Sequence, residues 1–151
     1  MSKELTLSLL GIKELWIEKA DFMEEPEKKF FRLFPGNRVR LRYGYVVTCI
    51  GCEKDKNGNI VKVLCDYIPD TKSGTPGADS IKVKGNIHWL STKYALNAEV
   101  FLYDRLFMSE QPGSKSNNYL DDINPNSIKV NKIKLEENLI NINPGDQYQF
   151  E

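Results

Sequence analysis

A cluster of basic side chains lies between residues 28 and 52 of a chain whose 21 basic and 21 acidic residues cancel overall. An Arg side chain can fork onto phosphates or onto the edges of bases, and Lys binds phosphates as a point charge. The cluster therefore indicates either a local nucleic-acid contact or a solvated face that carboxylates elsewhere balance. The segment, KKFFRLFPGNRVRLRYGYVVTCIGC, contains no Asp or Glu, and its basic residues are Lys28, Lys29, Arg32, Arg38, Arg40 and Arg42.

The middle of this segment, RVRLRYGYVV, alternates in the way that is typical of a strand. We expect one long strand over residues 38–50. Successive side chains of a strand point to opposite faces, so the arginines would share a solvent-directed face at a spacing of roughly 6.5–7 Å. That spacing suits a track along a single nucleic-acid strand. The residues expected on this face are Arg38, Arg40 and Arg42, with Val39, Leu41 and Tyr43 on the other.

Short apolar runs between Gly, Pro and Asn loops predict an all-β fold, either a sandwich or a barrel. The pair Asn57-Gly58 predicts a hairpin. The polar loop at residues 109–118 is the expected boundary between two sub-structures. Strands are expected at 14–17, 38–50, 60–67, 81–90, 98–107, 127–135 and 146–151, with a short helix within 21–31 and single turns at 118–123 and 135–140.

Several function classes are excluded by composition. The balanced charge argues against a protein that coats DNA, so no DNA partner is expected. No run of about 18 apolar residues predicts a membrane span. The odd count of three cysteines fits a reducing, cytoplasmic compartment.

Residues of catalytic or metal-binding types do not form a recognisable motif. Cys49 and Cys52 have metal-ligand spacing, but no second pair completes a zinc site, so no metal is expected. His88 precedes Trp89 and is interpreted as a structural histidine beside a buried indole. No glycine-rich phosphate loop is present. We therefore expect neither a catalytic residue nor a cofactor in this chain.

Longer sequence blocks give a more specific indication. VRLRYGYVV (39–47), KVKGNIHWLS (82–91), AEVFLYDRLF (98–107) and PGDQYQFE (144–151) follow one another in this order. In sequence and order they resemble the C-terminal anticodon-binding domain of the glutaminyl-tRNA synthetases. The resemblance extends over residues 14–151.

The resemblance implies two small antiparallel β-barrels, the first of them incomplete, with a few short helices. Residues 1–35 and 110–151 would form part of the proximal barrel, and residues 36–109 the distal barrel. The implied partner is the anticodon loop of the glutamine tRNA. A separate catalytic domain of the same class I ligase would use ATP and Mg²⁺ to attach glutamine.

The resemblance also implies roles for individual residues. Arg32 matches an arginine that contacts the third anticodon base, and Arg40 and Arg42 match basic residues near the first base. Lys29 would lie near the loop backbone, and Tyr43 beside the first-base contacts. Gln149 matches a glutamine of the pocket for the central uridine. The RNA-binding set implied is Lys29, Arg32, Arg40, Arg42, Tyr43 and Gln149.

Two departures from the family pattern concern the central-uridine pocket. The family motif continues beyond Glu151 with further residues, and another uridine-contacting arginine belongs to an upstream strand. We therefore expect the pocket to be incomplete and the chain to be a fragment of a longer protein. Two other interpretations remain open: the same module in an archaeal or eukaryotic-type glutamyl-tRNA synthetase, and a non-enzymatic β-domain for protein interaction.

Overall fold

The computed structural model describes residues 4–9 and 13–149, and this part of the chain is built mostly from strands. The predicted all-β class with a few short helices is confirmed. The strands are β1 (Glu4–Leu9), β2 (Lys13–Glu18), β3 (Arg38–Leu41), β4 (Val46–Lys54), β5 (Ile60–Tyr67), β6 (Gly85–Ile87), β7 (Leu90–Ser91), β8 (Leu96–Tyr103) and β9 (Ile128–Leu135). The 3-10 helices are η1 (Lys19–Asp21), η2 (Tyr119–Asp122) and η3 (Glu137–Asn141).

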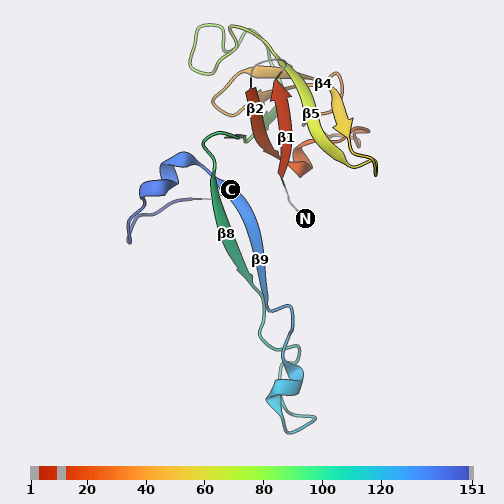
Figure 1. The fold of residues 1–151 in the computed structure, drawn as a ribbon, viewed down its shortest axis with the longest axis vertical. Helices are drawn as coiled ribbons and strands as arrows, with labels where there is room; N and C mark the ends of the chain where they lie inside the picture. Colours follow the sequence, from red (N-terminus) through yellow and green to blue (C-terminus); the bar gives the residue numbers. More distant parts are fainter. Residues whose placement is uncertain (1–3, 10–12, 150–151) are drawn as a thin grey trace. The chain divides into compact units, whose positions relative to one another are not determined.

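The chain divides into two compact units, the first made of Met1–Leu96 with Leu135–Glu151 and the second of Asn97–Lys134. The first unit holds a seven-stranded sheet in the order β6-β3-β4-β5-β1-β2-β7, curved into a half-barrel (Figure 1). Its two edge strands, β6 and β7, are separated by only two residues, so the edges come within about 10 Å of each other there. The pairs β1–β5 and β3–β6 are parallel, which the expectation of antiparallel barrels did not include.

Alternate side chains of these strands form the core of the first unit, as period-two patterning requires. Cys49 and Cys65 face each other in the β4–β5 register, buried and without a disulfide. A hydrogen bond with Cys49 and burial raise the pKa of the Cys65 thiol, which keeps it protonated at neutral pH. Among the described residues, no group of three or more His, Cys, Asp or Glu side chains could hold a metal ion. The fully buried side chains include Leu7, Leu33, Val39, Val47, Val63 and Ile87.

The predicted continuous strand over residues 38–50 is wrong, because a turn separates β3 from β4. Gly44 N donates to Leu41 O (2.7 Å) and Leu41 N to Tyr45 O (2.9 Å). Tyr43 adopts a left-handed φ of 58°. A Cβ on Gly44 would lie 3.2 Å from Leu41 O, so glycine suits this close approach. We call residues 41–45 the β3–β4 turn.

Four other local predictions are wrong. Residues 21–31 form no α-helix; after η1 the backbone is held by bonds from Met23 N to Leu33 O and from Leu33 N to Asp21 O. The strand expected at 81–90 is split into β6 and β7, and residues 146–149 form no strand, while 150–151 lie outside the described residues. His88 is exposed and lies 3.2 Å from Glu136, and thus is not a core histidine. The hairpin at Asn57-Gly58 is confirmed, with Gly58 at φ 81°.

The second unit is a two-stranded ribbon of β8 and β9 joined by the loop 104–127. Asn124 is buried and donates from Nδ2 to Arg105 O (2.9 Å), which anchors this loop. Many of its apolar side chains are exposed. The assignment of residues 1–35 and 110–151 to one barrel and 36–109 to the other stays a prediction. In the described part of the chain, helices long and apolar enough to cross a membrane are absent.

Candidate nucleic-acid interface

β3 has only four residues, and the predicted RNA-binding residues of the basic segment lie close to it in the chain. Arg40 lies within β3, while Arg42 and Tyr43 occupy the β3–β4 turn at its C-terminal end. Lys29 and Arg32 belong to the segment of turns and bends that precedes it. At about 3.3 Å per residue, the two ends of this strand are roughly 10 Å apart.

Arg40 does not project freely into solvent as the alternation predicted. Its Nη1 donates to Thr71 O (2.7 Å) and its Nη2 to Ala78 O (2.5 Å). Nη1 also lies 3.3 Å from Gly44 O, and Ser73 N donates to that same carbonyl (3.0 Å). The guanidinium therefore fastens the polar loop 71–78 to the β3–β4 turn, and the prediction of three arginines on one solvent face is wrong.

The turn presents an aromatic ring to solvent. Tyr43 is 78% exposed, and the guanidinium carbon of Arg42 lies 5.6 Å from the centre of its ring, within the range of a cation–π contact. The backbone of Arg42 is fixed on both sides: its N donates to Ile87 O (2.9 Å), and its O accepts from Trp89 Nε1 (2.9 Å). A positive φ is rare for a bulky residue and marks candidate functional positions. An exposed ring on a fixed turn is suited to stacking on an unpaired base.

Replacing Tyr43 with Gly is expected to separate binding from stability. Glycine accepts the left-handed φ without strain, so the free energy of unfolding should stay constant or rise by up to about 1 kcal/mol. Loss of the stacking ring should weaken binding to a glutamine-tRNA anticodon stem-loop by about 1–3 kcal/mol. Titrations and urea unfolding of the two proteins measure both effects.

Tyr94→Gly is the matched control, because Tyr94 is also exposed and also has a neighbouring cation, Lys93, 4.9 Å from its ring centre. Loss of the Tyr94 ring should leave the RNA affinity within a factor of two of that of the unmodified protein. Equal weakening by both substitutions would show that Tyr43 has no special part in binding.

Arg32 is held in place by a buried carboxylate. Its Nη1 forms an ion pair with Asp21, whose side chain is 3% exposed while that of Arg32 is 50% exposed. Burial raises the pKa of Asp21 above its ordinary value of 3.8, and the charge and hydrogen bond of Arg32 counteract that rise. Arg32 keeps other N–H donors for a ligand. Asp21 is thus a positioning residue for a half-exposed guanidinium.

The other two predicted residues have less support from their surroundings. Lys29 is exposed and has a left-handed φ of 72° in a turn. Gln149 is exposed in the non-strand segment 146–149. The described contacts do not bring Gln149 to the β3–β4 turn, so its role at the central base remains a prediction.

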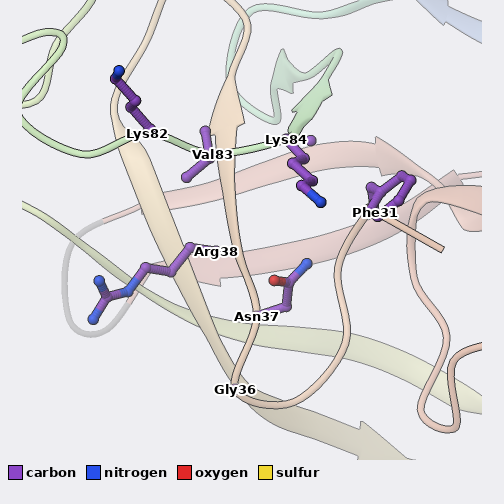
Figure 2. A pocket seen from close by; sticks show the side chains of 8 residues that line it. Phe31, Gly36, Asn37, Arg38, Lys82, Val83 and Lys84 are labelled. Carbon is purple, nitrogen blue, oxygen red and sulfur yellow. The ribbon is translucent and has the colours of Figure 1, made fainter. Parts of the chain in front are cut away.

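A hollow of about 290 Å³ lies at the N-terminal end of β3 (Figure 2). Its lining includes the basic residues Arg38, Lys82 and Lys84 together with Phe31 and Asn37. Sequence reasoning missed Lys82 and Lys84, although their alternate spacing repeats the pattern of Arg38 and Arg40. It also missed Asp21, for which the sequence carries no signal, because its burial depends on the backbone contact with residue 33.

Comparison with known proteins adds independent evidence. Two family models, both described as tRNA synthetases class I (E and Q), anti-codon binding domain, match residues 1–68 and 86–151. The chain is 62% identical over 139 residues to a glutamine–tRNA ligase of Ralstonia pickettii (strain 12J), and 55% identical over 139 residues to that of Bordetella pertussis (strain Tohama I). Each match covers 92% of this chain and 24% of the relative, so the chain spans about a quarter of these curated relatives. This chain belongs to the anticodon-binding domain family of the class I tRNA synthetases for glutamate and glutamine.

Proposed function

We propose that this chain recognises the anticodon loop of the glutamine tRNA as a module of a glutamine–tRNA ligase. The observation that carries the proposal is the Arg42–Tyr43 pair on a fixed turn, in a chain that belongs to the anticodon-binding family. Single-stranded RNA loops expose their bases, which proteins bind by stacking and by hydrogen bonds from Arg and amide groups. The turn supplies a stacking ring and a guanidinium side by side.

The proposed division of work has Arg32 and the β3–β4 turn contacting different anticodon bases. Arg32 enters with its orientation fixed by Asp21, which lowers the conformational entropy lost on binding. Arg42 and Tyr43 serve the first base, and Gln149 and Lys29 the central base and the loop backbone. Arg40 is proposed to act near the first base through the turn that it braces.

The whole ligase is proposed to be a cytoplasmic enzyme. In it, a catalytic domain outside this chain would bind ATP and Mg²⁺ and attach glutamine to the tRNA bound here. The glutamine–tRNA ligases that match the chain are about four times its length, which leaves ample sequence for such a domain.

Binding of whole tRNA transcripts tests this function. The 151-residue protein should bind the glutamine tRNA at least tenfold more tightly than the glutamate tRNA at 150 mM salt, where unspecific electrostatic attraction is weak. Preference for the glutamate tRNA would assign the module to a glutamyl-tRNA synthetase. Equal binding to both and to an unrelated tRNA would contradict anticodon recognition.

A further inference from the structure

The hollow beside the start of β3 is lined by cations that lack acidic partners. Among residues 4–9 and 13–149, neither Arg38, Lys82 nor Lys84 forms an ion pair. Two lysines elsewhere in the same unit are paired and serve for comparison: Lys54 lies 2.6 Å from Glu24, and Lys62 lies 2.6 Å from Glu14. A group of three unneutralised cations in a chain of zero net charge is a local positive field that attracts an anion.

The strand pairing brings the backbones of two of these residues together. Val39 pairs with Gly85 in the parallel β3–β6 register, so Arg38 at the start of β3 lies beside Lys84, the residue that directly precedes β6. The side chain of Val39 is buried, and period-two alternation directs Arg38 outward from the core. Adjacent strands lie about 4.8 Å apart, close enough for both long side chains to reach one extended ligand.

An aromatic ring completes the hollow, and its position is fixed by a glycine. A Cβ on Gly85 would lie 2.1 Å from Phe31 O, so only glycine lets the 31–32 segment pack against β6. Phe31 is 48% exposed, and Lys84 Nζ lies 5.0 Å from the centre of its ring. Figure 2 shows Lys84 and Asn37 reaching from opposite sides, with Phe31 beside Lys84, while Arg38 and Lys82 lie on the other side with their charged ends pointing apart.

This arrangement fits an extended polyanion better than a small ion. The cationic ends are spread around the rim and do not converge on one point. A single-stranded nucleic acid offers phosphates spaced along its backbone and bases that pack on exposed rings. The hollow supplies the matching groups, which are separated cations and an exposed aromatic ring. Arg32 follows Phe31 directly in the chain, so the hollow lies near a residue that is proposed to contact an anticodon base.

We infer that the hollow formed by Phe31, Arg38, Lys82 and Lys84 binds the sugar–phosphate backbone of a loop nucleotide next to the anticodon, with its base packed on Phe31. The inference rests on the proposed function, because the ligand is the same RNA loop. It adds a contact that depends on charge and stacking and reads no base identity. The contacts to phosphates position the RNA so that Arg32 and the residues of the β3–β4 turn can select bases.

The test compares two double variants that change net charge equally. Lys82→Gln with Lys84→Gln removes two unpaired cations, and Lys54→Gln with Lys62→Gln removes two paired ones. Binding of a glutamine-tRNA anticodon stem-loop, and of the same loop with a permuted anticodon, is measured with the 151-residue protein between 50 and 300 mM salt. Thermal unfolding verifies that each variant is folded.

The first double variant should bind both loops about tenfold more weakly at 50 mM salt, and the slope of log affinity against log salt should decrease by about 1.4. The second should change neither quantity appreciably. Phe31→Leu should weaken binding about tenfold with the salt slope unchanged. The ratio of the affinities for the glutamine loop and the permuted loop should be the same in every variant as in the unmodified protein.

The outcomes separate the two ideas. If the unmodified protein prefers the glutamine loop but the Lys82/Lys84 and Lys54/Lys62 variants behave alike, the backbone site is refuted and the proposed function stands. If the unmodified protein binds both loops equally, the proposed function fails. A loss of base preference in the Lys82/Lys84 variant would also overturn the inference, because the hollow would then be reading sequence.

Discussion

Replacing Arg40 with Ala is expected to lower the free energy of unfolding by about 2–4 kcal/mol. The substitution removes charged hydrogen bonds to Thr71 O and Ala78 O, each of which contributes about 1.5–3 kcal/mol when the donor is ionised. The estimate is below their sum because water can enter the half-exposed loop and satisfy the carbonyls. Urea unfolding followed by tryptophan fluorescence measures the loss, since Trp89 packs against the same turn.

Arg38→Ala is the control for this prediction. Arg38 lies two residues earlier on the same strand and is exposed, so its loss should change stability by less than about 0.5 kcal/mol. Equal stability of the Arg40 and Arg38 variants would show that the loop is held without the guanidinium. In the folded fraction of the Arg40 variant, weaker RNA binding would follow from a loosened β3–β4 turn.

Replacing Arg32 with Ala should give a pH-dependent loss of stability of about 2–3 kcal/mol at pH 7. The substitution leaves a buried, ionised Asp21 without its partner. The expected loss is at or below the stability usually lost when one partner of a buried ion pair is removed, because Arg32 is half-exposed and water partly screens the site. RNA affinity should also fall by about 1–3 kcal/mol if Arg32 contacts a base.

The pH dependence follows from the pKa of Asp21. Burial already raises this pKa in the folded protein, and the variant loses the two effects of Arg32 that lower it. A carboxyl with a raised folded pKa binds more protons when folded than when unfolded. Stability therefore falls as pH rises from the ordinary value of 3.8 through the folded pKa. The penalty in the variant should be largest at pH 7 and shrink toward pH 4.

The double variant Asp21→Asn with Arg32→Ala is the matched control, since it has no carboxyl at this position. Its stability relative to the unmodified protein should depend much less on pH between 4 and 7. A single Arg32 variant whose penalty is constant over that range would mean that Asp21 is not the group affected.

Strand positions were predictable wherever alternation and local turn chemistry agree. The strand at residues 60–67 and the hairpin at Asn57-Gly58 match the structure because Asn-Gly selects the turn and the flanking residues alternate. The strand at 38–50 was predicted without its turn because alternation continues through Arg42 and Tyr43. The left-handed φ of Tyr43 depends on tertiary contacts, including those of Trp89 and Ile87, that the local sequence does not reveal.

The candidate site was predictable in composition but not in geometry. The sequence located the basic segment and the residues of the anticodon-binding family. It could not show that Arg40 is bound by the loop 71–78, because those partners are more than 30 residues away. Nor could it show that Asp21 is buried beneath Arg32 or that Lys84 reaches Phe31, since each contact arises from the packing of distant segments.

An anticodon transplant tests the central claim most directly. Two transcripts are compared at 150 mM salt: a glutamine tRNA carrying the anticodon loop of an unrelated tRNA, and that unrelated tRNA carrying the glutamine anticodon loop. If the chain recognises the loop, binding to the 151-residue protein should follow the glutamine loop into the unrelated tRNA, with at least a tenfold preference over the reciprocal transcript. Binding that stays with the body of the glutamine tRNA, or equal binding to both transcripts, would contradict anticodon recognition by this chain.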